Sequence, residues 1–224
     1  MVAPILEAPP SVRRRTNGLI PPSPPPTGGG DGHDDDPSPR RPVMDNALLA
    51  TLFLIGGEIM FFAGLISAFW VLRVSAPVWP PPLQPRLPVG VTGANTVILF
   101  SSSAMIFMAR RALGLGERAT AVRHLWSAAG LGGTFLVVQG YEWLRLVSYG
   151  LTMSSSAYGS TFYTLVGAHA AHVLGALAWL TISATLLGRG RFTAGRTGAL
   201  RACALYWHFV VALWPVLYVT VYLL

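Results

Sequence analysis

The chain contains 224 residues, of which 52% are hydrophobic and only 11% are charged. Soluble domains carry about 25% charged residues, so this composition indicates a protein whose main solvent is lipid. The net charge of +7 does not point to a nucleic-acid partner, because the 16 basic residues are all arginines and most lie in short segments between apolar stretches. The single cysteine, Cys203, excludes an intramolecular disulfide framework.

Residues 1–42 differ in composition from the rest of the chain. They contain Pro-Pro and Pro-Pro-Pro runs, three consecutive glycines and an acidic patch at 31–36. Such a segment cannot bury enough apolar surface to offset the entropy of ordering it. We therefore predict a disordered Pro/Gly-rich cytoplasmic tail and interpret it as a tether; a docking arm for a partner is the alternative.

Residues 43–224 are predicted to form an all-α membrane domain. A bilayer core of about 30 Å requires roughly 20 apolar residues in a helix. Five stretches meet this requirement, at about 46–74, 92–113, 121–147, 157–187 and 199–224. The proline-rich link at 75–91 cannot be helical and is predicted to lie across a membrane surface. The expected architecture is a polytopic bundle of five transmembrane helices.

The arginines near the ends of these spans predict the orientation of the chain. Ten lie before the first span, between the second and third, or between the fourth and fifth: Arg40, Arg41, Arg110, Arg111, Arg118, Arg123, Arg189, Arg191, Arg196 and Arg201. The opposite side has only Arg73, Arg86 and Arg145. Cytoplasmic loops of membrane proteins carry an excess of basic residues. We therefore predict a cytoplasmic N-terminus and a C-terminus outside.

Small residues recur at helical spacing within the spans. Gly57 and Gly64 share a face of the first span, and Gly133 and Gly140 share a face of the third. Such pairs allow helices to approach closely in a membrane. We interpret them as packing positions without chemistry.

Glu58 lies near the middle of the first span and is the most informative single residue. A carboxyl group in lipid is costly and is rare without a function. One interpretation is a carboxyl that exchanges protons or regulates a partner. The other is a protonated group that is hydrogen-bonded to a neighbouring helix.

Three histidines lie within the last two spans. His169 and His172 are three residues apart on the fourth span, hence on one face, and His208 lies in the fifth. Imidazole is a common metal and haem ligand, and His172 with His208 could bracket a haem. The simpler interpretation, which we favour, is that these histidines bridge helices through hydrogen bonds.

Two further features are local. Glu142 and Arg145 are three residues apart near the outer end of the third span and are predicted to form an ion pair. Pro215 removes a backbone hydrogen bond within the fifth span, so a bend is expected there.

Taken together, six segments in order resemble subunit III of the haem–copper cytochrome c oxidases. The elements that match are Gly57-Glu58 followed by a double Phe, the Trp79-Pro-Pro loop, the helix at Asn95, the Gln139-Gly-Tyr-Glu142 element, Tyr158-Gly159-Ser160 followed by His169 and His172, and Tyr206-Trp207-His208 with Trp214 and Tyr218. The resemblance covers residues about 46–224.

The chain also departs from that family in three places. Many members have seven helices, whereas this chain has five and lacks the first two. The usual histidine pair after the second of these spans is replaced by Arg110 and Arg111, and an acidic residue of the last helix is replaced by Val211. Functions carried by those groups do not transfer.

The resemblance implies a non-catalytic subunit of a terminal oxidase in aerobic respiration, located in a bacterial plasma (inner) membrane as a multi-pass protein. It implies that haem and copper belong to subunits I and II and that this chain binds neither. Subunit III would stabilise subunit I, support proton uptake and bind structural phospholipids. A further respiratory complex is another candidate partner. Glu58 corresponds to the family's reactive buried carboxyl, and we expect His208, then His172 or His169, as its hydrogen-bond partner.

Three rival functions are compatible with parts of the sequence. A haem-binding membrane cytochrome would use His172 and His208. An intramembrane hydrolase would use Ser160, but the surrounding residues lack a Gly-x-Ser-x-Gly elbow. An accessory subunit of a quinol oxidase or of a nitric oxide reductase would have a similar core sequence. The chain does not predict the electron donor.

Overall fold

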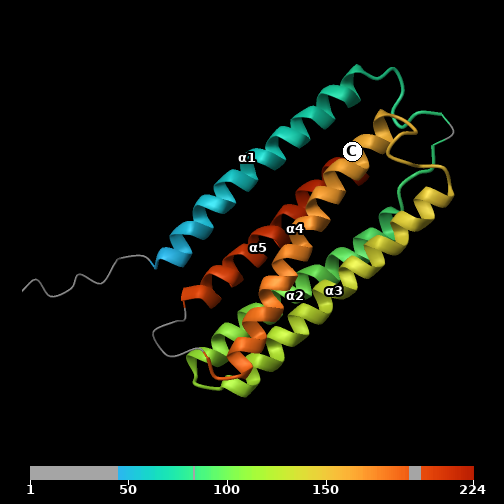
Figure 1. The fold of residues 1–224 in the computed structure, drawn as a ribbon. Helices are drawn as coiled ribbons and strands as arrows, with labels where there is room; N and C mark the ends of the chain where they lie inside the picture. Colours follow the sequence, from blue (N-terminus) through green and yellow to red (C-terminus); the bar gives the residue numbers. More distant parts are fainter. Residues whose placement is uncertain (1–44, 83, 192–197) are drawn as a thin grey trace, which may run out of the picture. The chain divides into compact units, whose positions relative to one another are not determined.

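The computed structural model describes residues 45–82, 84–191 and 198–224, so the predicted tail at 1–42 lies outside the described residues. The described chain consists of helices and contains no strand. This confirms the all-α prediction with five helices. They are α1 Asn46–Ser75, α2 Val89–Gly114, α3 Arg118–Ser148, α4 Ala157–Gly188 and α5 Gly198–Tyr218, the last continued by one π-helical turn, η1 Val219–Leu223 (Figure 1).

Local backbone chemistry sets where the helices end. Gly116 follows α2 with a φ of 79°, and Gly150 follows α3 with a φ of 89°. This left-handed conformation is disfavoured for residues with a side chain, and it lets the chain turn back on the helix end. The N–H of Glu117, for example, donates to the carbonyl oxygen of Ala112 at 2.9 Å. The turn after α2 can therefore be short, and α3 returns beside α2.

Within the residues that the structure describes, four helical segments are long and apolar enough to cross a membrane: α1, α2, α4 and the continuous stretch Gly198–Leu223. The helix α3 has 31 residues, so it is long enough. It is less apolar because it carries arginines near both ends and the polar side chains of Gln139 and Glu142 along its length. Its crossing of the membrane, which we predicted from the sequence, stays a prediction.

The helices pack in pairs that follow the chain. The helix α2 lies against α3, α3 against α4, and α4 against α5, while α1 contacts α5 and α4 (Figure 1). The largest fully buried side chains include Trp207 and Trp214 of α5, Phe135 of α3 and Phe162 of α4. The core of the described chain therefore lies around α5.

The outer helix α1 is much less buried than α5. Only three of its 30 residues are buried, whereas eleven of the 21 residues of α5 are. A Cβ atom added at Gly57 or Gly64 would meet no atom of the described chain within 4 Å. The close approach predicted at these glycines is therefore not made within the described chain.

Pro215 lies inside α5, and the α-helix changes to π-helical hydrogen bonding at Val219. Proline lacks the backbone N–H that the regular helix uses. The bend predicted at Pro215 stays a prediction; the change of helix type at Val219 is what the structure describes.

Candidate functional site

A carboxyl group and an imidazole meet where α1, α4 and α5 come together. The Oε2 atom of Glu58 lies 2.7 Å from Nε2 of His172 on α4. The hydroxyl of Tyr206 on α5 donates to Oε1 of Glu58 at 3.4 Å. The side chain of Glu58 is 11% exposed and that of His172 is 25% exposed. Three helices therefore converge on one largely buried carboxyl group.

The helix that carries His172 fixes the orientation of its ring. Nδ1 of His172 lies 2.6 Å from the carbonyl oxygen of Ala168, one helical turn earlier. A carbonyl oxygen can only accept a hydrogen bond, so Nδ1 must carry a proton. A neutral His172 then presents an unprotonated Nε2 to Glu58.

The 2.7 Å separation favours two arrangements of protons in the Glu58–His172 pair. If His172 is neutral, a separation of 2.7 Å between Nε2 and Oε2 requires a proton on the carboxyl group. If the ring is a charged imidazolium, it faces an ionised carboxylate. In both arrangements the pair holds one proton between its members and is neutral as a unit. Oε2 has no hydrogen-bond donor of good geometry in the described chain, so the contact is an ion-pair distance rather than a fully aligned hydrogen bond.

Aromatic side chains and an open cavity surround the pair. The ring of Phe62 meets His172 edge to face at 5.2 Å, and the ring of Phe61 lies 6.0 Å away. A cavity of about 420 Å³ opens beside the pair. It is lined by Phe53, Leu54, Gly57, Glu58, Phe61 and His172. The carboxyl and imidazole groups are therefore polar groups in the wall of an otherwise apolar cavity.

His208, the partner first expected for Glu58, lies elsewhere. Its Nδ1 atom makes a short hydrogen bond with Oγ of Ser103 on α2. Tyr206 and His208 are two residues apart, which is a rotation of about 200° around a helix. Tyr206 and His208 therefore lie on nearly opposite sides of α5. Tyr206 points toward α1, and His208 points toward α2. The structure corrects the expected ranking: His172, and not His208, contacts Glu58.

His169, the third candidate, also makes no contact with Glu58. Its side chain is fully buried and stacks on Trp214 of α5, with ring centroids 5.0 Å apart. The ring of Phe135 on α3 meets it edge to face at 6.4 Å. Neither ring nitrogen of His169 has a hydrogen-bond partner in the described chain. His169 therefore packs as an aromatic ring in the core.

Side chains from the segments that resemble the subunit III family join the helices to one another by hydrogen bonds. Asn95 on α2 donates from Nδ2 to the carbonyl oxygen of Phe135 at 3.0 Å. Gln139 on α3 donates from Nε2 to the hydroxyl of Tyr222 at 3.1 Å. A third such bond joins Trp207 on α5 to Ser102 on α2, from Nε1 to Oγ at 3.1 Å. These residues hold helices in register and are not aimed at a reacting centre.

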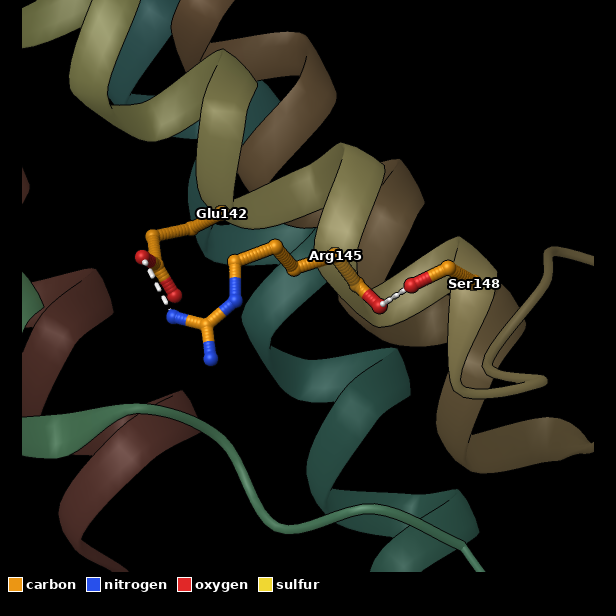
Figure 2. Close-up of polar contacts among 3 residues, drawn as sticks. All are labelled: Glu142, Arg145 and Ser148. Atoms are coloured by element: carbon orange, nitrogen blue, oxygen red, sulfur yellow. Dashed lines mark hydrogen bonds and ion pairs between the residues drawn. The ribbon is translucent and has the colours of Figure 1, made fainter.

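Glu142 and Arg145 form the predicted ion pair near the end of α3. Nη1 of Arg145 lies 3.4 Å from Oε1 of Glu142, and Figure 2 shows the guanidinium group turned back toward the carboxyl group. The carboxyl side chain is 6% exposed and the guanidinium side chain 46% exposed. The hydroxyl of Ser148 donates to the carbonyl oxygen of Arg145 at 2.7 Å (Figure 2). All three residues lie near the end of α3. The ion pair gives the buried carboxyl group of Glu142 a positively charged partner on the same helix.

The segment at the start of α4 is structural as well. Tyr158 packs edge to face on Trp79 at 5.2 Å, joining α4 to the proline-rich link. Ser156 caps α4 by accepting from the N–H of Gly159 at 3.1 Å. The hydroxyl of Ser160 donates to the carbonyl oxygen of Ala157 at 3.1 Å. Ser160 thus bonds within its own helix turn, which argues against its use as a nucleophile.

Comparison with known proteins identifies the family of the chain as a whole. The family model of cytochrome c oxidase subunit III matches residues 40–224. The chain belongs to the cytochrome c oxidase subunit III family. Cytochrome c oxidase subunit 3 of Corynebacterium diphtheriae is 36% identical over 182 residues, which is 78% of this chain and 86% of that protein.

Two further relatives have the same description. The probable cytochrome c oxidase subunit 3 of Nocardia farcinica is 34% identical over 178 residues, covering 78% of this chain and 86% of that protein. Cytochrome c oxidase subunit 3 of Synechocystis sp. is 35% identical over 174 residues, covering 77% and 73%. The predicted assignment to subunit III of the haem–copper oxidases is therefore confirmed.

The two histidines considered as haem ligands in this subunit III chain contact other groups of the described chain. Both ring nitrogens of His172 have close neighbours, Ala168 and Glu58, and Nδ1 of His208 is engaged by Ser103. In the ranges that the structure describes, no three side chains among His, Cys, Asp and Glu come together as a possible metal site.

Sequence reasoning missed Tyr206 and Ser103, which complete the contacts of Glu58 and His208. Both are ordinary residues for an apolar helix, and neither lies at helical spacing from its partner because the contacts join different helices. Their signal lies only in the resemblance to the subunit III family: Tyr206 is part of the Tyr-Trp-His element of the fifth span, and Ser103 ends the matching segment that begins at Asn95 in the second span.

Proposed function

We propose that this chain is the subunit III of a haem–copper terminal oxidase in the plasma membrane of a bacterium. Haem and copper would be held by subunits I and II, against which this chain packs without a catalytic centre of its own. Its function would be to stabilise subunit I through turnover and to support proton uptake. The family assignment supports the subunit identity.

The Glu58–His172 pair carries the proposal about proton uptake. Nδ1 of His172 faces the carbonyl oxygen of Ala168, so Nε2 is the ring nitrogen that lies beside the carboxyl group, 2.7 Å from Oε2. A proton can move between the carboxyl group and Nε2 while the pair stays neutral. If the pair gives that proton to a neighbouring acceptor, a carboxylate remains, so a second proton has to arrive to restore the neutral pair. This is the chemistry that a proton-supplying subunit needs.

Phospholipid is the ligand that we propose for the cavity beside the pair. Its walls are mostly the apolar side chains of Phe53, Leu54 and Phe61, and its volume is about 420 Å³. An acyl chain filling it would keep bulk water from Glu58. The pair would then exchange its proton with specific neighbouring groups rather than with bulk water.

Substitution of Glu58 tests the proton proposal. The Glu58→Gln variant of the purified oxidase should assemble normally and start with the activity of the unmodified enzyme. Its activity should decay faster over repeated turnovers at raised pH, because protons are scarce there and the exchanging carboxyl is missing. Oxygen consumption through successive additions of reductant measures both quantities.

Glu117→Gln is the matched control for this experiment. Glu117 lies exposed between α2 and α3 and forms no ion pair in the described chain, so its loss should leave the decay unchanged. Equal decay in the unmodified enzyme and the Glu58→Gln variant would show that Glu58 is structural only. It would leave the assignment to subunit III intact.

An accessory subunit of a quinol oxidase or nitric oxide reductase is the second candidate. The descriptions of the relatives support the cytochrome c oxidase. Purification by a tag on this chain, followed by identification of the largest co-purifying protein, distinguishes the complexes. Recovery without a haem–copper subunit I would overturn the proposed assembly.

A further inference from the structure

Three buried side chains of α2 and α3 have oxygen atoms that find no hydrogen-bond partner in the described chain. They are Oγ1 of Thr92, Oδ1 of Asn95 and Oε1 of Gln139. The three residues are only 1%, 2% and 3% exposed. A buried polar atom without a partner loses its bond to water and gains nothing in return. Each of these oxygens therefore needs a donor from outside the described chain.

The three side chains lie in one part of the bundle. Thr92 and Asn95 are three residues apart and share a face of α2. Nδ2 of Asn95 donates to the carbonyl oxygen of Phe135 at 3.0 Å, and Gln139 follows Phe135 by one turn of α3. Nε2 of Gln139 donates to the hydroxyl of Tyr222 at 3.1 Å. Polar groups of α2, α3 and η1 therefore meet at one end of the bundle.

The hydrogen bonds already made show that turning an amide around does not satisfy these groups. The carbonyl oxygen of Phe135 only accepts, so Asn95 must turn its nitrogen toward it and Oδ1 stays free. The hydroxyl of Tyr222 donates or accepts, so the amide of Gln139 fits either way round. In both orientations one polar atom of that amide has no partner.

A cavity of about 240 Å³ opens next to this group of side chains. Val89 of α2 and Tyr222 of η1 belong to its lining, and Val89 precedes Thr92 by about one turn. Arg73 and Arg86 line it as well, so its wall carries charged groups that retain water. One water molecule needs roughly 10–15 Å³ of such space. The cavity is therefore polar enough and large enough for several water molecules.

We propose that ordered water binds between α2, α3 and η1 and donates hydrogen bonds to Thr92, Asn95 and Gln139. Buried water in proteins typically bonds to about three polar groups that otherwise have no partner. The cavity beside Tyr222 supplies this water from the ends of the helices. Bound water then joins three helical segments whose own side chains do not complete the contact.

The chemistry of the three oxygens favours water over a metal ion or an acyl chain. Two amides and a hydroxyl carry no charge, whereas calcium sites in proteins use carboxylates. Glu142, one turn beyond Gln139, is already paired with Arg145 at 3.4 Å. An acyl chain has no hydrogen-bond donor. The site is separate from the cavity beside Glu58 and does not depend on the role of that carboxyl group.

A high-resolution structure of the whole oxidase tests the proposal directly. At a resolution that shows buried water elsewhere in the complex, we expect peaks about 2.7–2.8 Å from Oδ1 of Asn95 and Oγ1 of Thr92. Absence of such peaks, or protein donors on both atoms, would overturn the proposal. A peak about 2.3–2.4 Å from all three oxygens would identify a metal ion and would overturn it as well.

The substitution Thr92→Val gives a second test, in which the sign of the effect decides. Valine keeps the shape of the side chain and removes only the hydroxyl. If that hydroxyl bonds to water, the midpoint of thermal unfolding of the purified full chain should fall by about 2–4 °C. If it is dry, the substitution removes an unsatisfied group, and an unchanged or higher midpoint would contradict the proposal. In the structure of this variant, the peak beside position 92 should be lost.

Thr134→Val is the matched control. The hydroxyl of Thr134 lies on the exposed side of α3 and donates to the carbonyl oxygen of Gly130 in its own helix at 2.9 Å. Its removal should leave the midpoint unchanged. An equal fall in both variants would mean that any loss of a threonine hydroxyl destabilises these helices, and the proposal would fail.

Discussion

Glu58 shows how one polar residue can be accommodated in an apolar helix. An unpaired charge in the membrane is costly, so a buried carboxyl group needs a partner that can neutralise it. His172 provides that partner at 2.7 Å, and its ring is oriented by the carbonyl oxygen of Ala168. His169, one turn away, has no such partner in the described chain and stacks on Trp214 instead. The two histidines therefore differ in their contacts because His172 faces the carboxyl group of Glu58 and His169 faces the ring of Trp214.

Removing His172 should expose this dependence. We expect His172→Leu to destabilise the chain by about 1–3 kcal/mol, because the largely buried carboxyl group of Glu58 loses its imidazole partner. Thermal unfolding in detergent, followed by tryptophan fluorescence, measures the loss. Combining the substitution with Glu58→Gln should cost less than the sum of the two single effects. Additive effects would mean that the two groups are not coupled.

At the scale of single helices, α5 is the element against which the others pack. Its tryptophans are fully buried, and each donates a hydrogen bond to α2: Trp207 to Ser102 at 3.1 Å and Trp214 to Thr96 at 2.8 Å. The ring of Trp207 also fills the space beside Gly132 of α3. A Cβ atom at Gly132 would lie 2.5 Å from Cη2 of Trp207, which is too close.

Two neighbouring glycines of α3 provide a matched test of this packing. We expect Gly132→Ala to destabilise the chain by about 1–3 kcal/mol, because the methyl group displaces the Trp207 ring. Gly133→Ala should be neutral or slightly stabilising, since a Cβ atom there meets nothing within 4 Å in the described chain and alanine favours helix. The fraction of each variant that stays monodisperse after heating compares the two. Similar losses would show that the contact with Trp207 does not limit stability.

The molecule as a whole turns large apolar side chains outward. Phe53 is 75% exposed, Met60 77% and Val137 73%. In lipid this exposure carries no hydrophobic cost, and α1 in particular leaves most of its surface to lipid or to another subunit. The arginines near the helix ends then determine how the domain is inserted.

Orientation can be measured with single cysteines. In a Cys203→Ser background, Glu117→Cys lies between α2 and α3 and Ser154→Cys between α3 and α4. Because the arginine bias places the α2–α3 connection in the cytoplasm, a maleimide that cannot cross membranes should label Ser154→Cys in intact cells. Glu117→Cys should react only after the membrane is opened. The reverse pattern would invert the predicted topology, and labelling of both in intact cells would place α3 outside the membrane.

The sequence alone determined the helices and the contacts within them. Long apolar runs in lipid have to satisfy their own backbone hydrogen bonds, so composition and length predict helices directly. The ion pair between Glu142 and Arg145 followed from spacing, because residues three apart are neighbours on any helix. The family resemblance depends on the order of residues along the chain, so the sequence alone was enough to detect it.

Only the tertiary structure decided which helices face one another and at what rotation. It chose His172 over His208 for Glu58, since a rotation of about 200° between Tyr206 and His208 sends one toward α1 and the other toward α2. It placed Arg110 and Arg201 in the lining of one cavity, and it left open space in the described chain where a Cβ atom at Gly57 or Gly64 would lie. These outcomes depend on how side chains fill the space between helices, and no spacing along a single helix contains that information.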